Sequence, residues 1–172
     1  MATGGVGAPG HISGISLQNL IGVNFQFVPY RGSAPALQDV VAGHLETIIE
    51  QTSAALPQIR SGTVRAYAVT TNTRLDVLPD LPTVDEAGLP GFHVSVWQGM
   101  WAPKGTPKEV TVKIAAAVQA ALKEPETQRR LGELGQDIPE AALQTPEGLA
   151  AHHKSEIEKW WPLIKNAGIK GE

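Results

Sequence analysis

Short apolar runs alternate with amphipathic helical stretches over the first seventy residues. The run at residues 25–28 stops at Pro29, and a helical pattern begins at Ser33. The predicted strands are Phe25–Val28, Leu45–Glu50 and Val64–Thr70, and the predicted helices are Ile12–Leu20, Ser33–Val41 and Ala54–Ile59. Because strands alternate with helices, we expect a mostly parallel sheet in this half of the chain. Gly43 and Gly62 follow two of the helices at the position where a left-handed residue ends a helix.

The alternation stops at residues 71–92, where prolines and glycines predict an irregular segment with one helical turn at Val84–Ala87. The run His93–Trp101 follows, and we predict it to be a hinge or crossover strand. We predict no strand before the glycine-rich stretch Gly4–His11. A natural fold seldom starts in this way, so we expect the chain to be a fragment or truncated form.

The last third is predicted to be helical. Thr106, Pro107 and Glu109 have the spacing of a capping box, with a hydroxyl at the N-cap, proline at the first helical position and glutamate at the third. An apolar face follows at Val110, Ile114, Val118 and Leu122. A second helix is predicted from Pro125 to Gly135. A third is predicted from Thr145 to Gly168, with one stripe at Leu149, His153, Ile157, Trp160 and Ile164.

Composition excludes several classes of function. The chain has 172 residues, is 42% apolar and carries a net charge of −3 without a lysine or arginine cluster, so nucleic acid is not expected as a partner. The absence of cysteine excludes disulfides, thiolate metal sites and cysteine nucleophiles, and leaves the compartment open. No run approaches the roughly 20 apolar residues of a membrane span. No signal peptide is visible in this chain.

Two glycine-rich loops, each before a helix, are the candidate site. In the first, Gly5, Gly7 and His11 lie in a stretch whose backbone N–H groups could hold a carboxylate. An ordinary surface turn would have the same composition. The stretch is no dinucleotide fingerprint, because no strand is predicted before it, and no Gly-Lys-Ser/Thr of a P-loop follows.

The second loop offers Tyr30, Gly32 and Ser33, which supply a hydroxyl and an aromatic wall, N–H groups, and a hydroxyl at a helix start. Ser33 could equally be a plain N-cap. Glu50 ends a predicted strand, where open α/β sheets bind ligands, although a solvated loop carboxylate is the alternative. Trp97 could line a cleft.

Catalysis and metal binding are not predicted. No Gly-x-Ser-x-Gly elbow occurs, and no spacing singles out a catalytic triad, so we expect no enzyme. The adjacent His152 and His153 cannot form an i, i+4 metal pair, and no cofactor or metal is expected.

Five segments together resemble the substrate-binding proteins of the tripartite tricarboxylate transporter family, the Bug-type periplasmic receptors. They cover essentially the whole chain in the family's order. They are Thr3–His11, Val28–Gly32, Leu78–Gly91, Trp97–Pro107 and Ala167–Ile169. The resemblance implies a receptor with no catalytic activity, located in the periplasm, that captures a small carboxylate or dicarboxylate and works with the membrane components of a transporter.

The resemblance also implies an α/β, type II periplasmic-binding-protein-like fold. Residues 1–94 would form one largely complete second lobe with a parallel-rich sheet. Residues 95–172 would form a crossover strand and the helical C-terminal part of the first lobe, whose N-terminal part the chain lacks. The implied ligand-binding residues are Thr3, Gly5, Gly7, Ala8, His11, Tyr30, Gly32, Ser33, Glu50 and Trp97.

Two positions depart from the family pattern. Ala8 stands where the family usually has serine or threonine, and Glu50 stands where it usually has aspartate. Because the missing part would cover apolar faces, we expect a homo-oligomer. The alternative function is a degenerate fragment that binds no solute and acts as a self-associating structural or interaction module.

Overall fold

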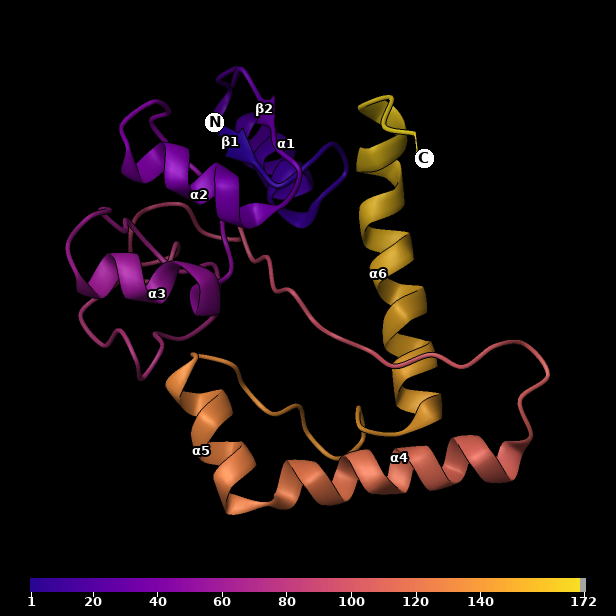
Figure 1. Ribbon diagram of the computed structural model, residues 1–172. Helices are drawn as coiled ribbons and strands as arrows, with labels where there is room; N and C mark the ends of the chain where they lie inside the picture. The colour runs from indigo at the N-terminus through magenta and orange to yellow at the C-terminus, as the bar shows by residue number, and fades with distance from the viewer. Residues whose placement is uncertain (171–172) are drawn as a thin grey trace. The chain divides into compact units, whose positions relative to one another are not determined.

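The computed structural model describes residues 1–170, and a short parallel strand pair lies at the start of the chain (Figure 1). β1 (Ala2–Thr3) pairs with β2 (Val28–Pro29), with Ala2 opposite Val28 and Thr3 opposite Pro29. A parallel bridge joins Ala2 to Ile48. The central position in this small sheet therefore belongs to β1.

Three helices follow these strand segments: α1 (Pro9–Ile21), α2 (Ser33–Val41) and α3 (Thr52–Arg60). Each contributes apolar side chains to the core around β1. The buried apolar residues of β1 and these helices are Ala2, Ile15, Ala36, Leu37 and Leu56. The fold is thus α/β with a parallel sheet, as the sequence predicts, although the sheet is much smaller than expected.

The expectation of no strand before the glycine-rich loop is wrong. β1 is a strand of two residues that are both buried, so the sequence shows no alternation of apolar and polar residues from which the strand could be predicted. The predicted strand Phe25–Val28 is also displaced, because the strand pair is formed by Val28 and Pro29. Phe25 N–H instead donates to Oε1 of Gln18 (3.3 Å).

Two further predicted strands shrink to single bridges. Leu45–Glu50 pairs only through Ile48, because the partner strand β1 offers two residues. Val64–Thr70 pairs only through Val69, which bridges to Thr83.

The prediction of a strand at His93–Trp101 is wrong. No ladder forms along this segment in the described chain, and Val94 O instead accepts the Thr70 hydroxyl (2.6 Å). Its tryptophans pack on other aromatic rings rather than on a neighbouring strand: the Trp97 and Trp101 ring centroids are 6.0 Å apart.

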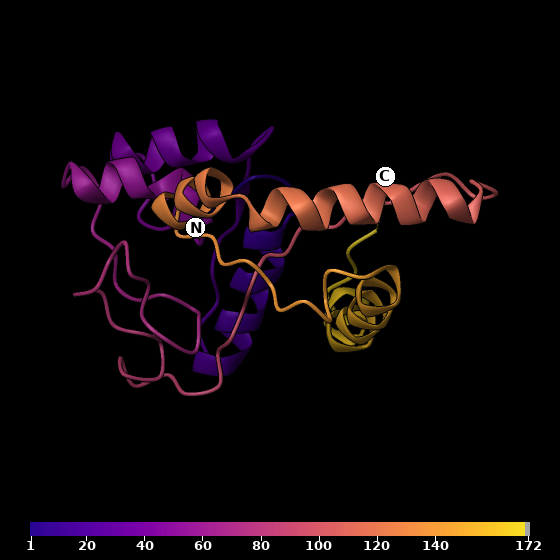
Figure 2. The ribbon, with the colours of Figure 1, turned by 90° about the horizontal axis from the view of Figure 1, so that it is seen from below.

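The described chain divides into two compact units. One comprises Met1–Val96 together with the chain from Pro162 onward, and the other is Trp97–Trp161. The second unit holds α4 (Lys108–Lys123), α5 (Pro125–Glu133) and most of α6 (Pro146–Asn166). Two views show α6 running across the direction of α4, and α5 turning away from the end of α4 (Figures 1 and 2). No helix in residues 1–170 has the length and apolarity to cross a membrane.

Glycine ends the helices where the sequence predicts. Gly43, Gly62, Gly135 and Gly168 all have φ between 66° and 77°. At the end of α6, Gly168 N–H donates to Lys165 O and Ile169 N–H donates to Ile164 O. This pair of hydrogen bonds defines a Schellman motif.

Of the predicted helix starts, some are confirmed and others are displaced. The Thr145 hydroxyl accepts Gly148 N–H (3.0 Å), which confirms the cap of α6. The predicted capping box at Thr106 is wrong, because α4 begins one residue later than predicted and its N-cap is Pro107, with no side-chain cap. The Thr106 hydroxyl donates to Pro103 O (2.8 Å). α1 begins at Pro9 rather than Ile12, since proline suits the first helical position.

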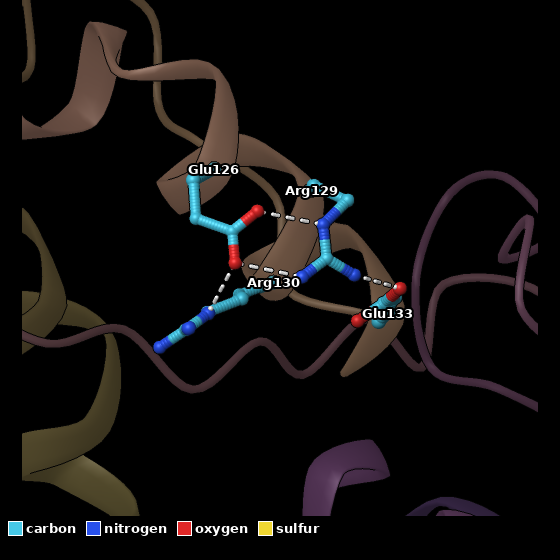
Figure 3. A network of polar contacts seen from close by, with 4 residues as sticks. All are labelled: Glu126, Arg129, Arg130 and Glu133. Atoms are coloured by element: carbon cyan, nitrogen blue, oxygen red, sulfur yellow. Dashed lines mark hydrogen bonds and ion pairs between the residues drawn. The ribbon is translucent and has the colours of Figure 1, made fainter.

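An ion-pair network covers the surface of α5 (Figure 3). Arg129 bridges Glu126 and Glu133, and Arg130 shares the Glu126 carboxylate. The two carboxylates raise the pKa of Arg129 further above its ordinary value. All four side chains are more than half exposed and lie three or four positions apart, which is a local means of stabilising a helix with no buried residue.

A capping box forms at a place that the sequence analysis did not single out. Thr83 N–H donates to Oε2 of Glu86 (2.8 Å), and Glu86 N–H donates to the Thr83 hydroxyl (3.2 Å). Arg74 Nε also donates to Oε2 of Glu86 (2.9 Å). The predicted helical turn at Val84–Ala87 is thereby fixed, with Ala87 N–H bonded to Thr83 O.

We expect acidification to destabilise the first unit. The Arg74 guanidinium, followed by Thr83 N–H, lowers the pKa of Glu86, and Gly91 N–H with His93 lowers the pKa of Asp85. A depressed pKa in the folded state contributes stability that is present above the unfolded pKa of about 4 and is lost as pH falls through the folded value. Urea unfolding at pH 7 and pH 3 measures this loss.

The matched variants are Glu86→Gln and Glu140→Gln. Glu86→Gln should reduce the difference in stability between the two pH values. Glu140 is an exposed residue whose side chain has no hydrogen bond in the described chain, so its variant should keep the wild-type pH dependence. Equal pH dependence in all three proteins would contradict the expectation.

Candidate functional site

Three strand segments end at the same edge of the small sheet. β1, β2 and the segment around Ile48 run parallel, so their carboxyl ends lie together. A loop and a helix start follow each of them, at α1, α2 and α3. In open α/β sheets this edge is where ligands bind, and helix N-termini there favour an anion.

The first two loops are tied to each other by backbone hydrogen bonds. Tyr30 N–H donates to Thr3 O (2.9 Å), and Gly32 N–H donates to Gly4 O (3.0 Å). A Cβ on Gly4 would lie 3.2 Å from Ser33 N, so a side chain there would push the two loops apart by a few tenths of an ångström. The sequence therefore brings the two predicted loops together, as an anion site requires.

Several backbone donors at this edge have no acceptor within the described chain. In the first loop these are Gly5 N–H and Val6 N–H, and at the start of α2 they are Ser33 N–H and Ala34 N–H. The first turn of α3 adds Thr52 N–H and Ser53 N–H, which also lack an acceptor among residues 1–170. Such groups are available to carboxylate oxygens.

Two predicted site residues hold the first loop. Thr3 is buried, and its hydroxyl donates to Gly5 O (3.4 Å). His11 Nδ1 accepts Gly7 N–H (3.0 Å), which leaves the proton of the neutral ring on Nε2. Partial burial lowers the pKa of His11 and favours this neutral form. Ala8 is the N-cap of α1 and, having no hydroxyl, makes no side-chain cap.

The second loop has a different support. Gly32 (φ 111°) is the N-cap of α2, so Ser33 is the first helical residue and not the plain N-cap of the alternative interpretation. The Tyr30 hydroxyl donates to Oδ2 of Asp39 (2.5 Å). This bond raises the pKa of Tyr30 and, with the His44 contact, lowers the pKa of Asp39.

Asp39 is a site residue that the sequence did not predict. Its only sequence signal is that it lies nine residues after Tyr30 on a helix whose start was already assigned to the site. The start of α3 was not predicted to belong to the site either, although it follows a strand and loop in the same way as the other two helix starts.

Glu50 and Trp97 lie in different surroundings. Oε1 of Glu50 accepts Gln51 N–H (2.8 Å), which places this carboxylate just before α3 at the same edge. Trp97 belongs to the second unit, where Nε1 donates to Oε2 of Glu156 (3.3 Å) and the ring lies 4.8 Å from that of His152. Its membership of the site stays a prediction. Residues 1–170 contain no group of three metal-ligating side chains.

Comparison with known proteins decides the family. The model of the tripartite tricarboxylate transporter family receptor matches residues 1–169. The chain belongs to this family. A UPF0065 protein from the TAR-I ttuE-ttuC′ intergenic region of Agrobacterium vitis is 41% identical over 167 residues, which is 96% of this chain and 48% of that relative. BugT of Bordetella pertussis is 30% identical over 98% of this chain and 51% of its own length.

Solved structures of this receptor family share the fold. The periplasmic binding protein BugD is 43% identical, with a TM-score of 0.89 over 99% of this chain and 57% of its own. MatC from Rhodopseudomonas palustris with bound malate is 38% identical, with a TM-score of 0.88 over 95% of this chain and 55% of its own. These findings confirm the predicted family and the periplasmic-binding-protein-like fold, and the relatives are solute-binding receptors rather than enzymes.

The chain spans about half the length of the first curated relatives and of the solved structures that it matches. A UPF0065 protein of Pseudomonas knackmussii is of similar length, since the match covers 93% of this chain and 94% of that protein at 34% identity. The assignment of residues 1–94 and 95–172 to two lobes of a receptor stays a prediction.

Proposed function

We propose that this chain is a solute-binding receptor, or a truncated form of one, that captures a small carboxylate at the edge where β1, β2 and Ile48 end. The observation that carries the proposal is a set of backbone N–H groups that have no acceptor among residues 1–170 and lie in the loop before α1 and in the first turns of α2 and α3. The net charge of −3 and the absence of a basic cluster mean that an anion would be held mainly by these donors.

The solved relatives support a carboxylate as the ligand. One is MatC with bound malate, and another is a protein of R. palustris with adipate, 33% identical to this chain with a TM-score of 0.86. Both ligands are dicarboxylates. A dicarboxylate could place one end on the helix starts described above, and the part of the receptor that this chain does not span would hold the other end.

Each predicted site residue has a proposed part in binding. Gly5 presents its N–H group in the first loop. Gly7 and Ala8 hold that loop in shape, because Gly7 N–H donates to His11 Nδ1 and Ala8 N–H donates to Gly5 O. Thr3 supports the same loop through its hydroxyl bond to Gly5 O. Gly32 and Ser33 present the second loop. Tyr30 orders that loop and Glu50 orders the start of α3, while a part for Trp97 stays a prediction.

The setting of the receptor follows from its family. BugD is a periplasmic binding protein, and the family serves tripartite transporters. We therefore place the protein in the periplasm, where it would deliver its ligand to the membrane components of such a transporter.

A second candidate function is a self-associating module that binds no solute. It is favoured by the second unit, because no residue of α4, α5 or α6 is buried while Trp101 and Trp161 are each 60% exposed. These surfaces call for a partner whether or not the first unit binds a ligand.

A thermal-shift panel with malate and adipate separates the two candidates. A carboxylate at 100 times its dissociation constant should stabilise the binding unit by about 2.7 kcal/mol, while a diamine of similar length should have no effect. A chain whose melting temperature responds to none of the carboxylates would favour the second candidate.

Glycine variants locate the site. Gly7→Trp and Gly32→Val should abolish the carboxylate shift, because both glycines have positive φ, which side chains rarely adopt, so the loops that carry the donors would change conformation. A Cβ on Gly7 would also lie 3.3 Å from Cγ2 of Ile169. Gly62→Val is the matched control: Gly62 and Gly32 both have positive φ and open space around them, but Gly62 lies past the end of α3. The control should lower the melting temperature and keep the ligand shift. A Gly32→Val protein that keeps the shift would place the site elsewhere.

A further inference from the structure

The loop from Pro29 to Ser33 is held from two sides. Its backbone is bonded to the first loop through Tyr30 N–H and Gly32 N–H. Its only side-chain tie in the described chain is the Tyr30 hydroxyl, which donates to the Asp39 carboxylate at 2.5 Å. The Tyr30 side chain is therefore turned along α2 and fastened to it.

Asp39 is suited to be a fixed anchor. It lies on α2 two residues beyond the buried Leu37, in the last turn of the helix. Its backbone carbonyl accepts His44 N–H (2.9 Å) in the turn that closes the helix at Gly43. Its second carboxylate oxygen, Oδ1, lies 3.3 Å from Nδ1 of His44. The carboxylate is thus oriented by contacts on both of its oxygens.

The bond joins the two ends of the segment that carries the proposed donors. Ser33 N–H and Ala34 N–H lie between Tyr30 and Asp39, and their direction depends on how the chain passes from β2 into α2. Gly32, with φ of 111°, gives that passage great freedom, because glycine has no Cβ to restrict it. The hydrogen bond between Tyr30 and Asp39 spans this glycine and restricts the backbone conformations of the loop before a ligand binds. Preorganisation of this kind raises affinity.

We propose that Asp39 is a positioning residue for the carboxylate site, which fixes the Pro29–Ser33 loop by accepting the Tyr30 hydroxyl. The inference rests on the proposed function for its effect on binding. Asp39 does not touch the ligand, and as an anion it would repel a carboxylate if its charge were its only effect. Positioning and repulsion therefore predict opposite results when Asp39 is removed.

The test combines calorimetry with malate or adipate and amide hydrogen exchange of the ligand-free chain. Asp39→Ala and Tyr30→Phe should each weaken binding about tenfold, as the loss of a hydrogen bond to a charged acceptor permits. The double variant should bind no more weakly than either single one, because both changes remove the same bond. Asp39→Asn keeps an acceptor oxygen and should restore most of the affinity.

Amide hydrogen exchange measures the stability of the loop's hydrogen bonds in the absence of ligand. Exchange of Tyr30 N–H and Gly32 N–H should become faster in Asp39→Ala and Tyr30→Phe, and return toward the wild-type rate in Asp39→Asn. Glu86→Ala is the control for general destabilisation, since it breaks the Thr83–Glu86 capping box away from this loop. It should leave both the affinity and these two amides unchanged.

Tighter binding in Asp39→Ala, or unchanged affinity with unchanged exchange, would overturn the inference while leaving the receptor function standing. A wild-type chain that binds no carboxylate would overturn the proposed function. The exchange rates would then decide by themselves whether Asp39 holds the loop.

Discussion

Replacement of Gly10 by valine is expected to disrupt the first unit and to abolish carboxylate binding. A Cβ at this position would lie 2.6 Å from the backbone carbonyl oxygen of Ile49, which is closer than real Cβ atoms approach. Ile49 directly follows the bridge between Ile48 and β1, so neither side can move without breaking the sheet edge. Overpacking of this kind costs about 1–3 kcal/mol, and valine adds two further methyl groups to the clash. Urea unfolding followed by circular dichroism measures the loss.

Gly132→Ala is the matched control. Gly132 also lies within a helix, α5, but a Cβ there would meet nothing within 4 Å. Alanine should stabilise that helix by up to about 1 kcal/mol, because glycine is the poorer helix former. If Gly10→Val unfolded at the same urea concentration as the wild type, the close approach of α1 to Ile49 would be wrong.

The chain alone is expected to be a dimer or a larger assembly at micromolar concentration. Large apolar side chains are exposed throughout the second unit, where no helix buries a residue. The most exposed are Met100, Trp101, Val112, Ile157 and Trp161. Apolar surface of this extent is seldom left to water, and a second copy of the chain offers the same surface.

Light scattering coupled to size exclusion measures the mass of the particle. Ile157→Glu should shift the assembly toward the monomer, because it places a charge in the middle of the apolar stripe of α6. Tyr67→Glu is the control, since Tyr67 is even more exposed (71% against 50% for Ile157) but lies in the first unit. A wild-type particle of 18.2 kDa with a cooperative melt would contradict the expectation.

Helices and their ends were predictable because their signals are local. Gly43, Gly62, Gly135 and Gly168 all end helices in the left-handed conformation, which only the neighbouring residues decide. The strands were not predictable in the same way. β1 has two residues, and which residues bridge to it depends on partners that are 26 and 46 positions away in the pairs Ala2–Val28 and Ala2–Ile48.

Of the two helix caps predicted at Thr-Pro sequences, one is confirmed and one is wrong. Thr106 and Thr145 have similar surroundings in sequence, and both hydroxyls donate to the carbonyl three residues back. Only the Thr145 hydroxyl also accepts a helix N–H, whereas α4 has Pro107 as its N-cap in place of Thr106. Thr83 and Glu86 form a full capping box at a turn too short to show helical periodicity.

The two loops of the candidate site were predictable from the sequence, but the side-chain hydrogen bonds that support them were not. Glycine content and the order strand, loop, helix are visible in the sequence at Gly4–His11 and Pro29–Ser33. That Thr3 and His11 would support the first loop, and that Asp39 would hold Tyr30, depends on side-chain directions that the fold sets.

The most direct test of the account is to map malate binding on the backbone amides by heteronuclear NMR. We expect the largest chemical-shift changes at Gly5, Val6, Ser33, Ala34 and the first turn of α3, whose N–H groups lack acceptors within the described chain. Saturating, concentration-dependent changes at these amides would place the carboxylate at the edge of the sheet. Changes confined to residues 97–161, or no change at a millimolar malate concentration, would contradict the account.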